Sequence, residues 1–219
     1  MAVSLVTVDR PETGQRGGRV DAVWDWVQVL SGLGLALFLA LHTLLTASVL
    51  LGASVLNAVA GALEAVHLDT LAHWIVPVLF LVHFAAAARK VPFRVREQRA
   101  LWAQARMLRH ADTWAWIFQA ASGMAVLLLG VMHMWTTINA GAIEAAASAA
   151  RVQSGGWVVL YLLLAPLGQA HAVIGVYRAG VKWGFIQDAC RAQAVRLGLY
   201  VLAGGLVLSL AALVRYATL

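Results

Sequence analysis

The sequence has little charge, little acid and almost no cysteine. Only 12% of its 219 residues are charged, and ten are Asp or Glu, whereas a soluble domain carries about 25% charged residues. With 62% hydrophobic residues and a mean hydropathy of +0.79, this excludes an ordinary soluble domain and indicates an integral membrane protein. Cys190 is the single cysteine, which excludes an internal disulfide and a metal centre built from several thiolates of this chain.

Five apolar runs are long enough to cross a membrane, which takes about 20 helical residues. We therefore predict an all-α fold, an integral membrane bundle of five transmembrane helices formed by residues 23–219. Residues 1–22 are polar and lack the pattern of a signal peptide, so they are predicted to form a cytoplasmic N-terminal arm. The five predicted spans lie near residues 27–51, 71–89, 114–138, 156–178 and 197–214.

The charges of the connections alternate in sign. The segments after the second and fourth spans are rich in Lys and Arg, whereas the segments after the first and third carry Glu64, Asp69 and Glu144 with Arg151 as the strong base. Because positive loops stay inside, this predicts a cytoplasmic N-terminus and a C-terminus on the other side. The net charge of +6 therefore reports topology, and no nucleic-acid-binding motif accompanies it.

The basic segment after the second span is itself amphipathic. Leu101, Trp102 and Leu108 alternate with Arg99 and Arg106 at roughly helical spacing. A helix lying on the membrane surface and a dock for a soluble partner both fit this pattern.

Four histidines, His42, His83, His133 and His171, each lie inside a different apolar run. A polar ring in hydrocarbon is costly, so four of them indicate a functional site. His42 lies about 15 residues, or roughly 22 Å, from the cytoplasmic start of its helix, and His133 is similarly far along, so both are predicted toward the outer side. His83 and His171 come late in helices that run inward, and both are predicted toward the cytoplasmic side.

An outer pair and an inner pair of imidazoles suit two stacked planar cofactors. Two imidazoles give a six-coordinate haem iron, which favours electron transfer, and haem b needs no Cys-x-x-Cys-His attachment, which is absent here. We predict two haem b groups, with His42 and His133 on the iron of one and His83 and His171 on the iron of the other. His73, near the outer end of the second span, is a competing outer ligand that we rank lower.

With these four histidines distributed one to each of four successive spans, about forty to fifty residues apart, the chain resembles the dihaem cytochrome b membrane anchors of quinol:fumarate reductases and succinate:quinone oxidoreductases, in the form with one anchor polypeptide of five spans. The resemblance covers nearly the whole chain beyond residue 22. It implies the same pairing, with the outer pair on the distal haem and the inner pair on the proximal haem. It also implies a multi-pass location in a prokaryotic inner membrane.

The resemblance implies further site residues. Propionates of the inner haem are expected near Gln28, Trp116 and Lys182, with Ser31 and Lys90 close by, for haem or quinone binding. Glu64 stands where similar proteins have a glutamate that accepts a proton from quinol. One position departs from the pattern: Gln169 replaces a glutamate found two residues before the fourth ligand in relatives that return protons across the membrane.

The implied function is electron transfer between menaquinol and cytoplasmic iron–sulfur and flavoprotein subunits that carry the dicarboxylate chemistry, in either direction. A quinone site near Glu64 and one near His83, His171 and Lys182 both remain open, and a dimer of the whole complex is allowed. One alternative is the cytochrome b anchor of a formate dehydrogenase or hydrogenase. A proton or metal transporter lined by histidine belongs to a different class, and the scarcity of Asp and Glu in the spans counts against it.

Overall fold

The computed structural model describes residues 13–219, all of whose regular secondary structure is helical. Five helical segments are long and apolar enough to cross a membrane, which confirms the predicted all-α bundle of five spans. They are α1 (Thr13–Ala47) with the short η1 (Ser48–Leu51), α3 (Leu68–Ala88), α5 (Ala111–Ile138), α7 (Trp157–Lys182), and α8 (Arg191–Ala217) with the preceding η2 (Asp188–Cys190). Residues 13–22 of the predicted arm are the first turns of α1, and residues 1–12 lie outside the described residues.

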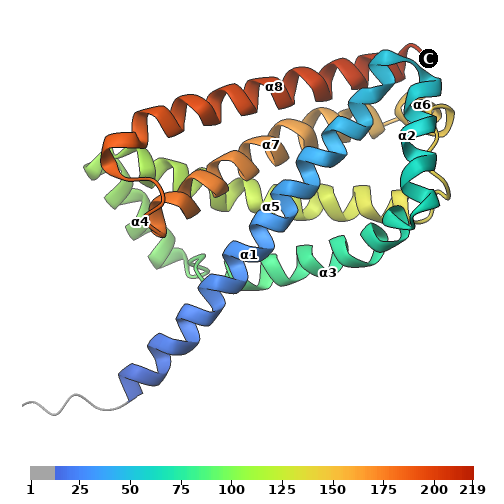
Figure 1. Ribbon diagram of the computed structural model, residues 1–219. Helices are drawn as coiled ribbons and strands as arrows, with labels where there is room; N and C mark the ends of the chain where they lie inside the picture. The colour runs from blue at the N-terminus through green and yellow to red at the C-terminus, as the bar shows by residue number, and fades with distance from the viewer. Residues whose placement is uncertain (1–12) are drawn as a thin grey trace, which may run out of the picture.

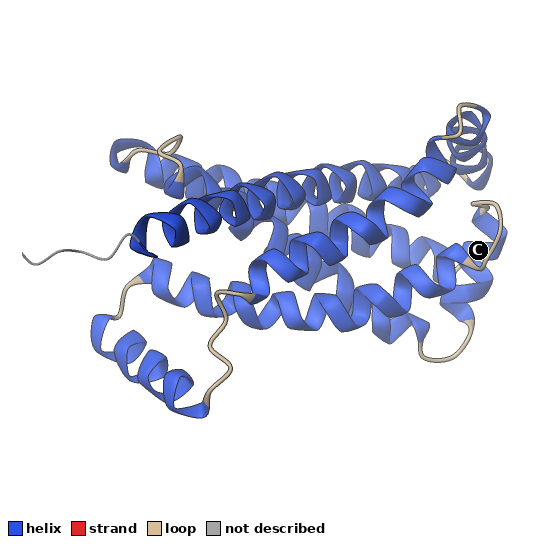
Figure 2. Ribbon diagram, turned by 90° about the horizontal axis from the view of Figure 1, so that it is seen from below, coloured by secondary structure: helices blue, strands red, loops and turns tan. Residues whose placement is uncertain are grey.

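Three shorter helices lie at the ends of the bundle. Helix α4 (Val95–Leu108) stands at one end, and α2 (Ala53–Ala65) and α6 (Ala145–Gln153) lie together at the other, near the C-terminus (Figure 1). We call the α4 end the inner end and the other the outer end, following the orientation predicted from the loop charges. Helix α4 projects from the end of the bundle (Figure 2).

The four histidine-bearing helices pack against one another. Helix α1 packs against α3, α7 and α8, and α5 packs against α7 and α3. Helix α8 completes the bundle beside α1 and α7. Many large apolar side chains along these helices are exposed, Leu37 and Trp74 among them, because lipid rather than protein covers the outside of a membrane bundle.

The best-buried apolar cluster lies at the outer end. It joins η1, α2, α6 and the last turns of α8, and its members are Val49, Leu56, Ala145, Ala149, Val152, Ala212, Leu213 and Tyr216. Gly52, at φ 131°, makes the sharp turn from η1 into α2. Asn57 Oδ1 accepts a 2.8 Å hydrogen bond from the backbone N–H of Ala145, which ties α2 to the first turn of α6. The outer end is therefore a packed cap.

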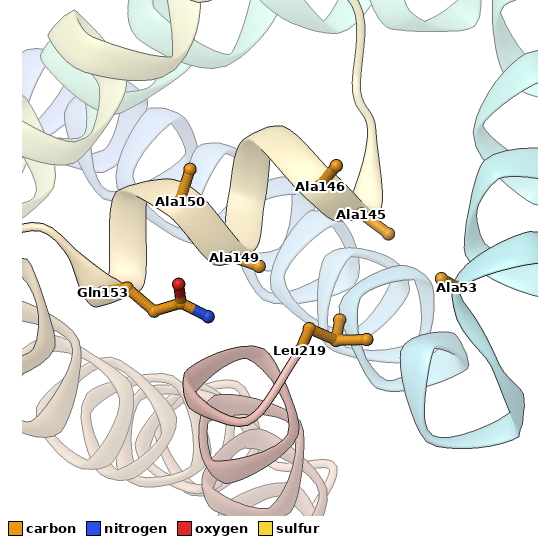
Figure 3. Close-up of a pocket in the computed structure, with 7 residues that line it drawn as sticks. All are labelled: Ala53, Ala145, Ala146, Ala149, Ala150, Gln153 and Leu219. Carbon is orange, nitrogen blue, oxygen red and sulfur yellow. The ribbon is translucent and has the colours of Figure 1, made fainter.

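A pocket of about 260 Å³ opens in this cap. Small aliphatic side chains and Gln153 line it (Figure 3). It contains none of the four intramembrane histidines, so the candidate site lies elsewhere.

Candidate haem-binding and quinone-reactive site

The four intramembrane histidines form two pairs across the bundle. The ring centroids of His42 on α1 and His133 on α5 are 5.9 Å apart, and those of His83 on α3 and His171 on α7 are 6.5 Å apart. These are the pairs expected from sequence depth. A metal–nitrogen bond of about 2.0–2.1 Å on each side puts the centroids of two imidazoles on one metal roughly 6 Å apart. Both pairs therefore have the spacing that a shared metal requires.

The protonation of His83 follows from its partners. Its Nδ1 lies 3.0 Å from the backbone carbonyl oxygen of Gln28 and 3.2 Å from Ser31 Oγ. A carbonyl oxygen can only accept, so Nδ1 carries the proton and donates it. The lone pair then resides on Nε2, which is the nitrogen free to bind a metal.

His171 has the same tautomer for a different reason. The side-chain amide of Gln119 donates both to His171 Nε2 at 3.3 Å and to the His171 carbonyl oxygen at 3.1 Å. Because an NH₂ group only donates, Nε2 holds the lone pair, and Nδ1 donates to Ser122 Oγ at 3.1 Å. A metal at Nε2 would replace the amide of Gln119 there.

The two inner histidines rest on glycines of the neighbouring helices. A Cβ at Gly32 would lie 2.8 Å from Cε1 of His83, and a Cβ at Gly123 would lie 3.0 Å from Cε1 of His171. Only glycine lets these rings approach the backbones of α1 and α5. The glycines that stand three residues before a ligand do not have this role: a Cβ at Gly130 would meet Phe80, and a Cβ at Gly168 would meet nothing within 4 Å.

These contacts arise from one sequence pattern used twice. Gln-x-x-Ser-Gly followed by nine residues and His spans 28–42 on α1 and 119–133 on α5. In each copy the Gln, Ser and Gly contact an inner histidine from another helix, and the terminal His belongs to the outer pair. Gln119, Ser122 and the two glycines were missed from sequence, although this repeated spacing was a signal that could have found them.

The outer pair has a more apolar surrounding. The Phe38 ring stacks on His42 with centroids 5.5 Å apart, and Tyr161 of α7 meets His133 edge-on at 5.6 Å. Nδ1 of His133 is buried without a hydrogen-bond partner in the described part of the chain.

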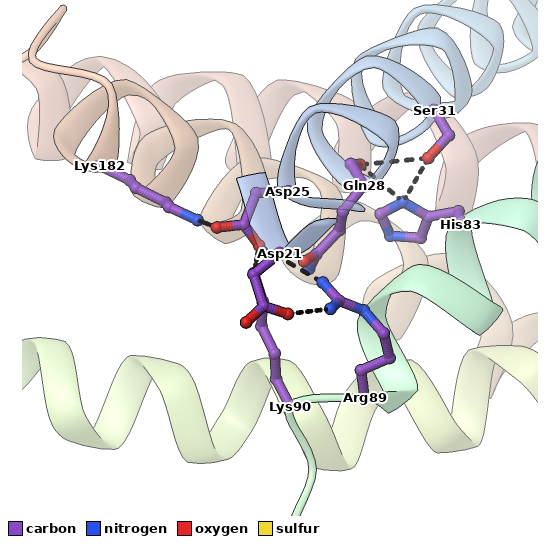
Figure 4. Close-up of polar contacts among 8 residues, drawn as sticks. All are labelled: Asp21, Asp25, Gln28, Ser31, His83, Arg89, Lys90 and Lys182. Atoms are coloured by element: carbon purple, nitrogen blue, oxygen red, sulfur yellow. Dashed lines mark hydrogen bonds and ion pairs between the residues drawn. The ribbon is translucent and has the colours of Figure 1, made fainter. Parts of the chain in front are cut away.

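A cluster of charges closes the inner end (Figure 4). Asp25 on α1 pairs with Lys182 at the end of α7 and, at 2.5 Å, with Lys90 just beyond α3. Arg89 lies 2.8 Å from Asp21 and 3.6 Å from Asp25. Burial lowers the pKa of the Lys90 ammonium, and its hydrogen bond to Asp25 opposes that shift.

The structure brings some of the other predicted residues to the inner site and leaves others apart. Gln28 and Ser31 contact His83 (Figure 4). Trp116, on α5, is partly buried one turn before Gln119. Glu64 is exposed in the last turn of α2, and His73 is partly buried on α3.

Gln169 is buried between three helices. Its side-chain amide donates to Thr43 Oγ1 at 2.9 Å, and its Oε1 would lie 2.6 Å from a Cβ at Gly205 on α8. Thr43 in turn donates to the carbonyl oxygen of Leu39. The amide that stands in place of a glutamate is thus a neutral, hydrogen-bonded contact of α1, α7 and α8.

Comparison with known proteins identifies the family of the chain. Residues 95–212 match the family described as succinate dehydrogenase/fumarate reductase transmembrane subunit. The chain is 30% identical over 197 residues to the fumarate reductase cytochrome b subunit of Wolinella succinogenes, covering 84% of this chain and 77% of that protein. It is 28% identical over 185 residues to the corresponding subunit of Helicobacter pylori, covering 80% and 72% respectively. The chain belongs to the family of succinate dehydrogenase/fumarate reductase transmembrane subunits, and so is a membrane subunit of an oxidoreductase complex.

Proposed function

We propose that this chain is the dihaem cytochrome b anchor of a menaquinol:fumarate reductase or succinate:menaquinone oxidoreductase in a bacterial inner membrane. The observation that carries the proposal is the pair of histidine pairs at 5.9 and 6.5 Å, one toward each end of the same bundle. Membership of the family, and the names of its Wolinella and Helicobacter relatives as cytochrome b subunits, support the same conclusion.

Bis-histidine haem supplies reversible one-electron transfer when bound. His42 and His133 would hold the outer group, and His83 and His171 the inner one. Gln28 O, Ser31 and Ser122 keep the proton of the inner histidines on Nδ1, so that each presents Nε2. Lys90 and Lys182 at the inner end, with Trp116 on the α5 side, would bind propionates as they leave the hydrocarbon.

Protons would enter or leave at the outer end. Glu64, exposed on α2, would accept a proton as menaquinol is oxidised beside the outer group. The Gln169 amide cannot ionise, so a proton relay through that position is not part of the proposal. A quinone site at the inner end, near His83, His171 and Lys182, is the alternative placement.

The dicarboxylate reaction would take place on other subunits. Iron–sulfur and flavoprotein subunits would meet the inner end, where α4 carries exposed arginines and its Trp102 packs against Trp114 with ring centroids 5.7 Å apart. Lys90 and Lys182 would then lie between the inner haem and the iron–sulfur cluster that exchanges electrons with it.

Reduced-minus-oxidised spectra of the purified full-length complex test the proposal. We expect two low-spin b haems in the parent, loss of the outer signal in His42→Ala, and loss of the inner signal in His83→Ala. His73→Ala is the matched control and should keep both. A colourless protein would refute the proposal and favour a transporter. Copurified flavin and iron–sulfur subunits with fumarate or succinate activity would distinguish this complex from a formate dehydrogenase or hydrogenase anchor.

A further inference from the structure

Asp25 is a carboxylate shared by three cations from two segments of the chain. It pairs with Lys182 from α7, with Lys90 from the turn after α3, and at longer range with Arg89 (Figure 4). Its side chain is only 22% exposed, compared with 74% for Asp21. The carboxylate of Asp25 is therefore partly shielded from water, whereas its partners Lys90 and Lys182 are 38% and 44% exposed.

Helical spacing aligns this cluster with the inner histidines. Lys90 follows His83 by seven residues and Lys182 follows His171 by eleven, which correspond to about two and three turns at 3.6 residues per turn. Asp25 precedes Gln28, which contacts His83, by three residues and so lies on the same side of α1. The two ammonium groups and Asp25 therefore lie beyond the inner pair along its own helix faces.

The charged cluster at the inner end has a net positive charge, which favours binding of an anion. Two carboxylates, Asp21 and Asp25, face three cations, Arg89, Lys90 and Lys182, so one positive charge is in surplus. A dianionic group that emerges from between the inner histidines would meet both lysines, with Asp25 between them.

We propose that Asp25 is a positioning residue for the inner haem: it holds Lys90 and Lys182 in place for the propionates, and its negative charge lowers the reduction potential of that haem. This inference rests on the proposed dihaem function. Removing the charge favours the reduced iron because a nearby negative charge disappears.

The test is a potentiometric titration of haem absorbance in the intact, membrane-embedded complex, with the inner signal identified as the one lost in His83→Ala. A unit charge about 10 Å away at an effective dielectric constant of about 20 alters an equilibrium roughly tenfold. In Asp25→Asn we therefore expect the reduced-to-oxidised ratio of the inner haem, at a fixed ambient potential, to rise about tenfold. The outer haem serves as the internal reference and should not move.

Two further variants separate positioning from simple helix clamping. Asp25→Glu keeps the negative charge, so the reduction potential of the inner haem should equal that of the parent. Asp21→Asn removes a similar pair one turn further out, where water screens it, and should alter the ratio by about twofold or less.

The possible outcomes separate the positioning role of Asp25 from the proposed dihaem function. An inner haem lost from Asp25→Asn but retained in Asp25→Glu supports the positioning role. Unchanged potentials in Asp25→Asn, an equal shift of both haems, or loss of the inner haem from both variants overturns it while leaving the dihaem function intact. Absence of haem from the parental complex overturns the proposed function itself.

Discussion

Replacing Gly32 by alanine tests the inner site through a single methyl group. The added Cβ would lie 2.8 Å from Cε1 of His83, so the ring must move by about 0.6 Å to reach an ordinary 3.4 Å contact. Movement of the ring away from α1 is opposed by its hydrogen bonds, because Nδ1 is bound at 3.0 Å to Gln28 O and at 3.2 Å to Ser31 Oγ on the same turns of α1. A shift of that size breaks at least one of these bonds.

The two costs add. Overpacking costs about 1–3 kcal/mol, and the lost hydrogen bond costs about 0.5–1.5 kcal/mol. Since 1.4 kcal/mol is about a factor of ten, inner haem affinity should fall by at least tenfold and by up to about a thousandfold. Gly123→Ala, at 3.0 Å from Cε1 of His171, should act in the same direction but less strongly.

The assay is the haem content per chain, measured as pyridine haemochrome, together with the reduced-minus-oxidised spectrum after washing at increasing dilution. We expect Gly32→Ala to lose the inner signal first and to keep the outer one. Gly204→Ala is the control, since it lies on α8, which carries none of the four histidines, and a Cβ there meets nothing within 4 Å. Retention of both haems by Gly32→Ala through the dilutions that strip neither from the parent would refute the argument that the glycine is needed for the approach of His83.

Two further substitutions test the packing around the site. Gly205→Ala places a Cβ 2.6 Å from Oε1 of the buried Gln169, and this overpacking should cost about 1–3 kcal/mol of stability and lower the thermal midpoint. Gly204→Ala, with open space around it, should leave the midpoint unchanged. Equal midpoints for the two variants would contradict this. Asn57→Ala removes the acceptor of the Ala145 N–H and should destabilise the outer cap by about 1 kcal/mol, which can be measured as faster amide hydrogen exchange in α6. Asn57→Asp retains an acceptor oxygen, so amide exchange in α6 should match that of the parent.

Hydropathy and loop charge predicted the five spans because both signals are local. A run of apolar residues must cross hydrocarbon as a helix, and depth along each span then separates His42 from His83 without knowledge of any contact. The bounds predicted for the last four spans differ from the helices by at most six residues, whereas α1 begins at Thr13, 14 residues before the predicted start of the first span. The orientation of the termini stays a prediction.

The outer cap was not predicted. Residues 53–65 and 145–153 were interpreted as connections, yet they form α2 and α6. Both are rich in alanine and too short to span a membrane, so neither hydropathy nor length identified them. Their stability comes from packing with η1 and the end of α8, which joins residues far apart in the sequence.

The ion-pair partners of the inner-end lysines could not be predicted from the sequence either. Lys182 was predicted to face propionates, but in this structure it pairs with Asp25, 157 residues away. No spacing rule relates those two positions, because their contact depends on how α1 and α7 cross. The roles of Gln119 and Ser122 were more accessible, since both stand on α5 at the same spacing as Gln28 and Ser31 on α1.

The two histidine pairs share one scaffold but differ in what surrounds them. With haem bound as proposed, partners on Nδ1 of His83 and His171 would make the inner imidazoles more basic and favour oxidised iron, whereas the surplus positive charge of the Asp25 cluster would favour reduced iron. At the outer pair the neighbours are the rings of Phe38 and Tyr161, and Nδ1 of His133 has no hydrogen-bond partner among residues 13–219. In the proposed dihaem protein, the difference between the two potentials is therefore set by residues outside the ligand set. Four identical ligands would then suffice for two unlike sites, and in that proposal the direction of electron transfer between the two haems depends on residues such as Ser31, Ser122 and Asp25 rather than on the histidines.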